Sequence, residues 1–249
     1  VHPLRREIIA TYITNSVLNR MGSSFIFRMR EATSEGGPVI ARAYTAAREM
    51  YNSRNLWVQI ESLDNRVAAT VQIEMLQYSR RLLERASLWL LRHRRRSLDI
   101  EATVQQFSGG IESLREGLPG LLKDHEAADF ARACRHFTSA GVPEDLARWV
   151  VSLEVLYSGL DLVEVADRTH LPVASVADVY FSLASELEFS WLRESIMALP
   201  AHNHWQHKAR GAMLATLYTH ARALTDNVLQ TTVSEETPAQ RLAEWLEQN

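Results

Sequence analysis

Apolar residues recur every three or four positions along most of this chain, the spacing of one face of an α-helix. The longest uninterrupted pattern of this kind runs from Val67 to Arg96 and contains neither glycine nor proline. Within it, all four side chains of Leu88–Leu91 are apolar, which indicates an end that is enclosed on every side. At a rise of 1.5 Å per residue the segment would be about 40 Å long. We therefore predict a long central helix over about 67–96, with the other helices packed around it.

Glycine, proline and capping residues divide the rest of the chain into further helices. The apolar stripe from His2 predicts one helix that ends at Ser34–Gly37, and Asp99 is expected to cap a short helix ending near Phe107. The remaining helices are expected at about 38–52, 53–63, 122–139, 143–157, 160–169, 172–189, 190–199, 203–233 and from Thr237 onward. No segment alternates convincingly with the period of two that a strand requires, so we predict an all-α, multi-helix bundle without a β-sheet.

Two glycine-containing stretches mark the weakest part of the helical pattern. Residues 108–110 and 119–120 predict breaks on either side of a short helix. They are the candidate boundary between possible sub-bundles 1–107 and 121–249 within a single helical domain, 1–249.

Composition agrees with a helical protein that has a large core. The chain has 249 residues, of which 46% are hydrophobic, with only 10 glycines and 7 prolines. The single cysteine, Cys134, excludes an internal disulfide and favours a reducing, cytoplasmic compartment, and we interpret it as a small buried hydrophobe. No run of eighteen apolar residues predicts a membrane span. Because the chain starts at Val1 without a signal-peptide pattern, we expect it to be a segment of a longer polypeptide.

Charge is divided unevenly along the chain. Residues 1–120 carry 17 basic and 12 acidic side chains, and residues 121–249 carry 10 and 18. Only Lys123 and Lys208 are lysines; the other basic residues are arginines, which favour bidentate ion pairs at packed interfaces.

Three groups of residues are candidates for chemistry. His202, His204 and His207 lie close together, but His202 precedes the expected helix start and no fourth zinc ligand is evident, so a solvated helix start is the better interpretation and no metal site is predicted. The basic run Arg92–Arg96 at the end of the central helix would suit phosphate. Cations at a helix C-terminus also complement the helix dipole. We therefore prefer to explain the basic run by this interaction, or by interdomain salt bridges, over a site for nucleic-acid phosphate.

The third candidate, residues 160–181, has the apolar spacing of a helix-turn-helix, with His170 where the turn often has glycine. A recognition helix needs arginine, lysine, asparagine or glutamine toward the bases. No basic residue occurs between Thr169 and Leu192, so we interpret this segment as a helical corner and predict no nucleic-acid partner.

Several blocks of sequence together resemble one family. They are HPLRREIIAT, NRMGSSFIFRMREAT, RRLLERASLWLLR followed by SLDI, VADVYFSL, WLRESIMALP and HWQHKARGAMLATLY. From His2 to about Leu229 the chain resembles the C-terminal portion of the large, bacterial-type NAD-specific glutamate dehydrogenases.

The resemblance implies a full-length enzyme that oxidises L-glutamate with NAD to 2-oxoglutarate, ammonium and NADH, with its catalytic parts upstream of this segment. This chain has no strand followed by GxGxxG, and neither lysine stands in a glycine-rich context, so we assign no catalytic or cofactor-binding residue to it. We expect a non-catalytic structural or oligomerisation domain, with the catalytic domain of the same polypeptide and further copies as partners. The alternatives are a regulatory module whose arginines hold an effector's carboxylate and, less favoured, the helix-turn-helix module.

Overall fold

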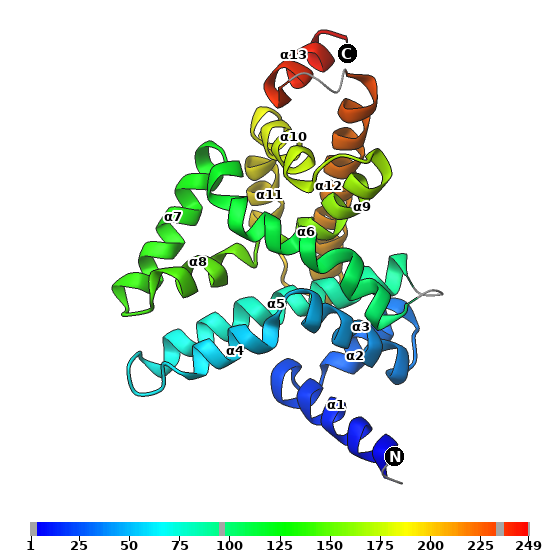
Figure 1. Cartoon of the computed structure of the whole chain (residues 1–249), viewed down its shortest axis with the longest axis vertical. Helices are drawn as coiled ribbons and strands as arrows, with labels where there is room; N and C mark the ends of the chain where they lie inside the picture. Colours follow the sequence, from blue (N-terminus) through cyan, green and yellow to red (C-terminus); the bar gives the residue numbers. More distant parts are fainter. Residues whose placement is uncertain (1–3, 95–97, 233–236, 249) are drawn as a thin grey trace. The chain divides into compact units, whose positions relative to one another are not determined.

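The computed structural model describes residues 4–94, 98–232 and 237–248, and these residues form helices and turns only (Figure 1). The described residues contain thirteen α-helices and one short 3-10 helix, and no strand occurs among them. The prediction of an all-α fold without a sheet is therefore confirmed. The helices are α1 Arg5–Met21, α2 Phe25–Thr33, α3 Gly37–Met50, α4 Ser53–Glu61, α5 Ala69–His93, α6 Ile100–Leu121, α7 Asp124–Ser139, α8 Glu144–Ser152, η1 Leu156–Ser158, α9 Gly159–Thr169, α10 Val173–Glu186, α11 Phe189–Ala198, α12 His204–Thr231 and α13 Pro238–Gln248.

Contacts divide the chain into two units, and both units are discontinuous in sequence. Unit 1 consists of residues 1–112 and 133–157, and unit 2 consists of residues 113–132 and 158–249. Helices α6 and α7 each contribute residues to both units.

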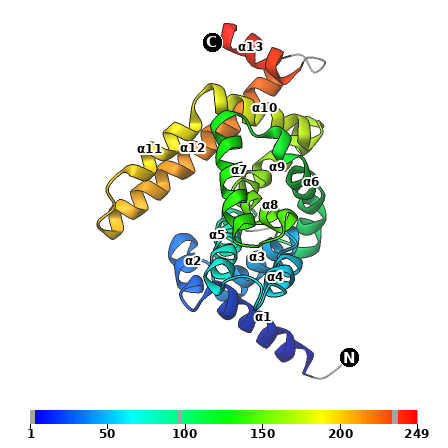
Figure 2. The same ribbon diagram turned by 90° about the vertical axis from the view of Figure 1, so that its left-hand side faces the viewer.

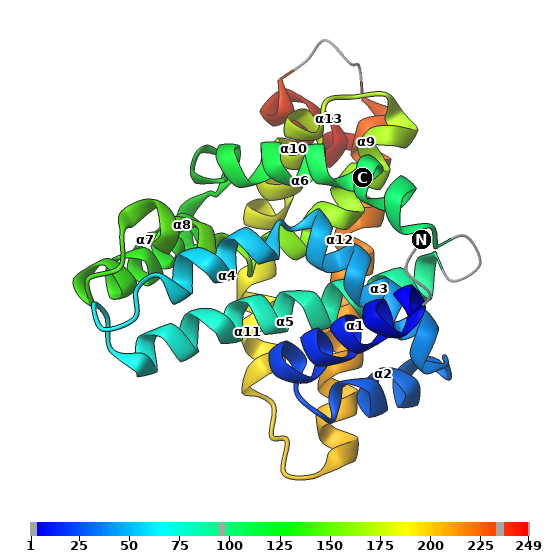
Figure 3. The same cartoon turned by 60° about the horizontal axis from the view of Figure 1, so that its bottom comes forward.

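Unit 1 is organised around α5, the predicted central helix. This helix packs against α1, α2, α3, α4 and α8, and Figure 3 shows α1, α3 and α4 beside it. Its C-terminal end is enclosed at three of the four expected positions: Trp89 is only 3% exposed, Leu90 is fully buried and Leu91 is 2% exposed, whereas Leu88 is half-buried. The helix predicted at 203–233 forms as α12 in unit 2 and, with 28 residues, is longer than α5 with 25. Gly211 weakens the α12 pattern in the sequence, but glycine is tolerated at this exposed position.

The predicted single helix at the start of the chain is wrong, because Gly22 divides it into α1 and α2. The backbone of Gly22 has φ +81°, in a region that favours glycine, and its N–H donates to the carbonyl of Leu18. A Cβ atom at this position would also lie 2.9 Å from a guanidinium nitrogen of Arg80. The chain therefore turns where the sequence pattern suggested that the helix continues.

The predicted break at residues 108–110 is also wrong, since α6 runs through it, whereas the break predicted at 119–120 lies next to the observed one, where α6 ends at Leu121 and α7 begins at Asp124. The cap at Asp99 is confirmed: its Oδ1 accepts a hydrogen bond of 2.8 Å from the N–H of Ala102. The expected end near Phe107 does not occur. The buried apolar residues of α6 keep helical spacing across the glycines, and these are Phe107, Ile111, Leu114 and Leu118. Periodic burial therefore outweighs the modest helix penalty of each glycine.

Unit 2 is organised around α10, which packs against α9, α11, α12 and α13. Helices α11 and α12 form an antiparallel pair joined by residues 199–203 (Figure 2). Two predicted helix starts are confirmed by their caps. Asn203 Oδ1 accepts from the N–H of Gln206, and Thr237 exchanges hydrogen bonds with Gln240 at the start of α13.

Candidate functional site

The three histidines of the predicted solvated helix start lie at the beginning of α12. His202, His204 and His207 are all exposed, and His202 precedes the N-cap Asn203 as expected. Among the described residues, no group of three or more His, Cys, Asp or Glu side chains is arranged to hold a metal ion. The ring of His204 instead contacts Trp205, with centroids 5.8 Å apart.

The basic end of α5 is held by aromatic contacts as far as the structure describes it. His93 stacks on Trp89 with ring centroids 4.6 Å apart, and its Nδ1 lies 2.9 Å from the Trp89 carbonyl oxygen. The guanidinium of Arg94 lies 5.6 Å from the ring centroid of Phe107. Arg92 is exposed, while Arg95 and Arg96 lie outside the described residues. Of the three basic residues of this run that the structure describes, His93 and Arg94 therefore contact unit 1 itself.

The predicted helical corner is formed by α9 and α10. His170 adopts a left-handed conformation with φ +56°, the backbone that a glycine would commonly supply at this turn. On α10, Asp178 is paired with Lys123 at 3.2 Å. In the helix at the position of a recognition helix, Asp178 is therefore neutralised by a lysine from another segment, and α10 itself carries no lysine or arginine.

Cys134, expected to be buried, is half-buried on α7. Partial burial raises the pKa of its thiol, and Glu144 raises it further, against the opposing effects of Arg148 and Arg135. The thiol is therefore not activated as a nucleophile at neutral pH.

A groove that the sequence interpretation missed lies on unit 1 between α1, the start of α3 and Ile26 of α2. We call it the α1–α3 groove. It has a volume of about 590 Å³, within the range of small-molecule sites. Most of its lining is aliphatic, and the aliphatic residues are Ile9, Ala10, Ile13, Val17, Leu18, Ile26, Pro38, Ala41 and Ile100. The remaining lining residues are Arg6, Arg42, Thr14, Thr45 and Gly37, so no acidic side chain contributes.

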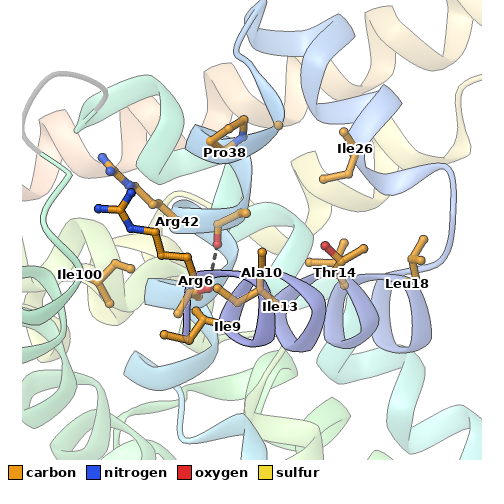
Figure 4. A pocket seen from close by; sticks show the side chains of 14 residues that line it. Arg6, Ile9, Ala10, Ile13, Thr14, Leu18, Ile26, Pro38, Arg42 and Ile100 are labelled. Atoms are coloured by element: carbon orange, nitrogen blue, oxygen red, sulfur yellow. Dashed lines mark hydrogen bonds between the residues drawn. The ribbon is translucent and has the colours of Figure 1, made fainter. Parts of the chain in front are cut away.

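Two arginines stand at one end of the α1–α3 groove. Figure 4 shows the side chains of Arg6 and Arg42 extending side by side near Ile100, whereas Leu18 and Ile26 lie at the other end. Both arginines are exposed, and the side chain of neither forms an ion pair or hydrogen bond with any residue that the structure describes. The groove is therefore apolar along its length and cationic at one end.

The sequence contained one signal for this groove. Arg6 falls on the same helical face as Ile9, Ile13 and Val17, so a cation is aligned with an apolar stripe. Arg42 and Ile100 come from distant parts of the chain, and only the tertiary fold brings them to the same groove.

Comparison with known proteins identifies the family. The family described as "Glutamate dehydrogenase, C-terminal" matches residues 1–249. The chain belongs to this family. Relatives in the glutamate dehydrogenase family include proteins named NAD-specific glutamate dehydrogenase from Pseudomonas aeruginosa (36% identical over 248 residues), Halomonas elongata (32% over 245) and Mycobacterium tuberculosis (31% over 244). The alignments cover 98–100% of this chain but only 15% of each relative.

These comparisons confirm the resemblance to large NAD-specific glutamate dehydrogenases. The chain corresponds to a C-terminal portion of relatives that are several times longer. No helix within the described part of the chain is long and apolar enough to cross a membrane.

Proposed function

We propose that this chain is the non-catalytic helical C-terminal domain of an NAD-dependent glutamate dehydrogenase. The full polypeptide would oxidise L-glutamate to 2-oxoglutarate and ammonium with reduction of NAD, as the names of the relatives suggest. In this proposal the chain docks on the catalytic domain of the same polypeptide and contributes to subunit contacts in a cytoplasmic homo-oligomer. The NAD site and the reacting groups belong to the rest of the polypeptide.

Apolar side chains exposed on unit 1 carry the proposal. Leu4, the N-cap residue of α1, is followed at intervals of four by Ile8 and Tyr12 on α1, and these three side chains are 54–56% exposed; Phe27 on α2 is 75% exposed. Leu4, Ile8 and Tyr12, which we call the α1 stripe, lie on a different face of α1 from the residues of the α1–α3 groove. A series of exposed apolar residues at helical spacing is typical of an interaction surface. The docking role predicts that a partner covers the α1 stripe.

Large apolar side chains are also exposed on unit 2. Trp191 on α11 is 61% exposed, Trp205 on α12 is 76% exposed, and Met197 and Met213 are about half-exposed. Tryptophan and methionine are enriched at protein interfaces and depleted from solvated surfaces. These exposed side chains suit the subunit contacts of the proposed oligomer.

The two lysines of the chain have surroundings that fit a non-catalytic role. Lys123 pairs with Asp178, and the ammonium of Lys208 lies 5.7 Å from the ring centroid of the exposed Trp205. Neither lysine lines the α1–α3 groove. The absence of basic residues from α10 likewise supports a protein partner over nucleic acid.

The docking proposal is tested in the complete polypeptide by making the α1 stripe polar. We expect the triple variant Leu4→Gln, Ile8→Gln and Tyr12→Gln to lower the melting temperature, because these side chains lose their apolar contacts with the catalytic domain. Glutamate-dependent NADH formation would persist while the protein stays folded. Val58→Gln is the matched control, because Val58 is 64% exposed on α4 and lies outside the α1 stripe.

Three results would contradict the proposal. If the stripe variant melted like the Val58→Gln control, the stripe would not be a docking surface. Deletion of the whole segment tests the wider role: we expect a loss of assembly or stability, so an unchanged oligomer mass with unchanged melting would contradict it. Saturable binding of NADH to the segment, measured by calorimetry, would contradict a non-catalytic role.

A second candidate function is a regulatory module that binds an effector. The observation that favours it is the unpaired cationic end of the α1–α3 groove, formed by Arg6 and Arg42. A thermal-shift screen of the complete polypeptide tests it, with a ligand-dependent rise in melting temperature as the expected result.

A further inference from the structure

We propose that the α1–α3 groove binds an anion with an apolar tail, such as a medium-chain carboxylate. Arg6 and Arg42 would bind the head group, and the tail would lie along α1 toward Leu18 and Ile26. This inference rests on the second candidate function and is independent of the docking role of the α1 stripe.

The shape and lining of the groove favour an elongated apolar tail. Arg6 and Leu18 are twelve residues apart on one helix, which corresponds to about 18 Å along the helix axis. Thr14 and Thr45 are the hydroxyl groups among the lining residues, and the Thr45 hydroxyl already donates to the Ala41 carbonyl at 2.8 Å. A sugar or nucleotide would therefore leave many polar groups without partners, whereas an alkyl chain requires none.

The charges at the end of the groove favour an anionic head group. Arg6 lies in the first turn of α1, where a cation opposes the positive end of the helix dipole. Arg42 is one helical turn from Pro38, which lies in the first turn of α3. Two adjacent guanidinium groups repel one another in the absence of a counter-charge, and each presents donors suited to carboxylate or phosphate oxygens. Binding an anion relieves this repulsion and supplies acceptors for both arginines.

The same lining disfavours a free amino acid. The ammonium group of an amino acid requires an acceptor or a negative charge, and no acidic side chain lines the groove. A ligand that carries only negative charge at its polar end avoids this cost. The arginine content alone permits any effector with a carboxylate, including an amino acid. The lining of the groove narrows the proposed class of ligand to those without a positive charge.

The test measures dodecanoate binding to the complete polypeptide by isothermal titration calorimetry, below the concentration at which dodecanoate forms micelles. Dodecanoate combines a carboxylate with an extended chain that is shorter than the groove. We expect saturable binding with one site per chain. Arg6→Gln and Arg42→Gln should each weaken binding by about tenfold or more, the effect of losing one charge-assisted hydrogen bond. Ala10→Phe should also abolish or strongly weaken binding, because the larger ring occupies the path of the tail.

Arg5→Gln is the matched control, since Arg5 lies in the same turn of α1 but does not line the groove. Acetate tests the head group alone, and dodecyltrimethylammonium tests the same tail with a positive head group; both should bind at least about tenfold more weakly than dodecanoate. Circular dichroism melts of each variant separate loss of binding from loss of folding.

The proposal is overturned if dodecanoate does not bind saturably to the complete polypeptide, or if Arg5→Gln weakens binding as much as the groove arginines do. Equal binding of dodecyltrimethylammonium would also overturn it, because the tail alone would then determine affinity. These outcomes are independent of the oligomer mass and melting that test the docking role.

Discussion

The indole Nε1–H of Trp57 on α4 donates a hydrogen bond of 2.9 Å to Oγ of Ser79 on α5, and both side chains are buried. This bond joins the central helix of unit 1 to α4. Ser79→Ala would leave a buried N–H without this acceptor, so we expect a loss of about 1–3 kcal/mol in the free energy of unfolding. Chemical denaturation measures it. Ser62→Ala, at an exposed serine that follows α4, should cost less than about 0.5 kcal/mol, and equal losses in the two variants would contradict this account.

Trp89 lies in the enclosed end of α5, 3% exposed, with its ring 5.7 Å from that of Phe107 in an edge-to-face arrangement. Trp89→Ala removes this packing and leaves a cavity, so we expect a loss of about 3–5 kcal/mol. Trp205→Ala makes the same substitution at a side chain that is 76% exposed, and should cost less than about 0.5 kcal/mol in the segment. A loss below about 1 kcal/mol for Trp89→Ala, measured by thermal or denaturant unfolding, would show that this end of α5 is not core.

Arg222 on α12 connects two carboxylates of α9 within unit 2. Its Nη1 lies 3.0 Å from Oδ1 of Asp161 and 3.6 Å from Oε2 of Glu164. These groups are partly buried, so Arg222→Ala should cost about 1–2 kcal/mol, between the values typical of surface and buried pairs. The exposed pair of Arg148 with Glu144 provides the control, for which Arg148→Ala should cost less than about 0.5 kcal/mol. Unfolding at low and high salt checks both values, and equal costs in the two variants would contradict the assignment.

Glu126 on α7 gives unit 2 a specific dependence on pH. Burial raises the pKa of its carboxyl, Asp129 raises it further and Arg193 lowers it, and Oε2 has no hydrogen-bond partner among the described residues. The folded state therefore binds this proton more tightly than the unfolded state does. The contribution of Glu126 to the free energy of unfolding therefore decreases as the pH rises from the ordinary glutamate pKa through the raised pKa of the folded state.

Glu126→Gln should remove this decrease in stability with rising pH. We expect the variant to be more stable than the parent protein above this pH window and to lose its advantage below it, as measured by melting temperature across a pH series. Glu194→Gln, at an exposed carboxyl on α11, is the control. An advantage for Glu126→Gln that is independent of pH, or one that grows as the pH falls, would contradict the assignment.

The helices could be predicted from the sequence where apolar periodicity and capping residues agree. Val67–Arg96 predicted the central helix that the structure places at Ala69–His93, because its apolar stripe is uninterrupted by glycine or proline. The caps at Asp99, Asn203 and Thr237 involve partners only three residues away, so local sequence was sufficient to find them.

Two predictions at glycines were wrong: the helix was expected to continue through Gly22 and to break at Gly109 and Gly110. The effect of a glycine depends on the surrounding structure. Gly22 ends α1 with a positive φ next to Arg80, whereas Gly109 and Gly110 lie within α6 between buried positions. The local sequence is compatible with a helix or a turn at each place. Contacts with residues distant in the chain determine which one forms.

The sequence by itself determined the helical class of this protein, the position of its central helix, its capped helix starts and its glutamate dehydrogenase family. Each follows from residues close together in the chain or from the order of sequence blocks. Only the tertiary structure decided that Arg6, Arg42 and Ile100 share one groove, and that the two units are discontinuous in sequence. The physical reason is that helical periodicity specifies which face of a helix is apolar but not which partner covers it. That choice depends on packing between distant segments, and it leaves the α1 stripe and the α1–α3 groove open on unit 1.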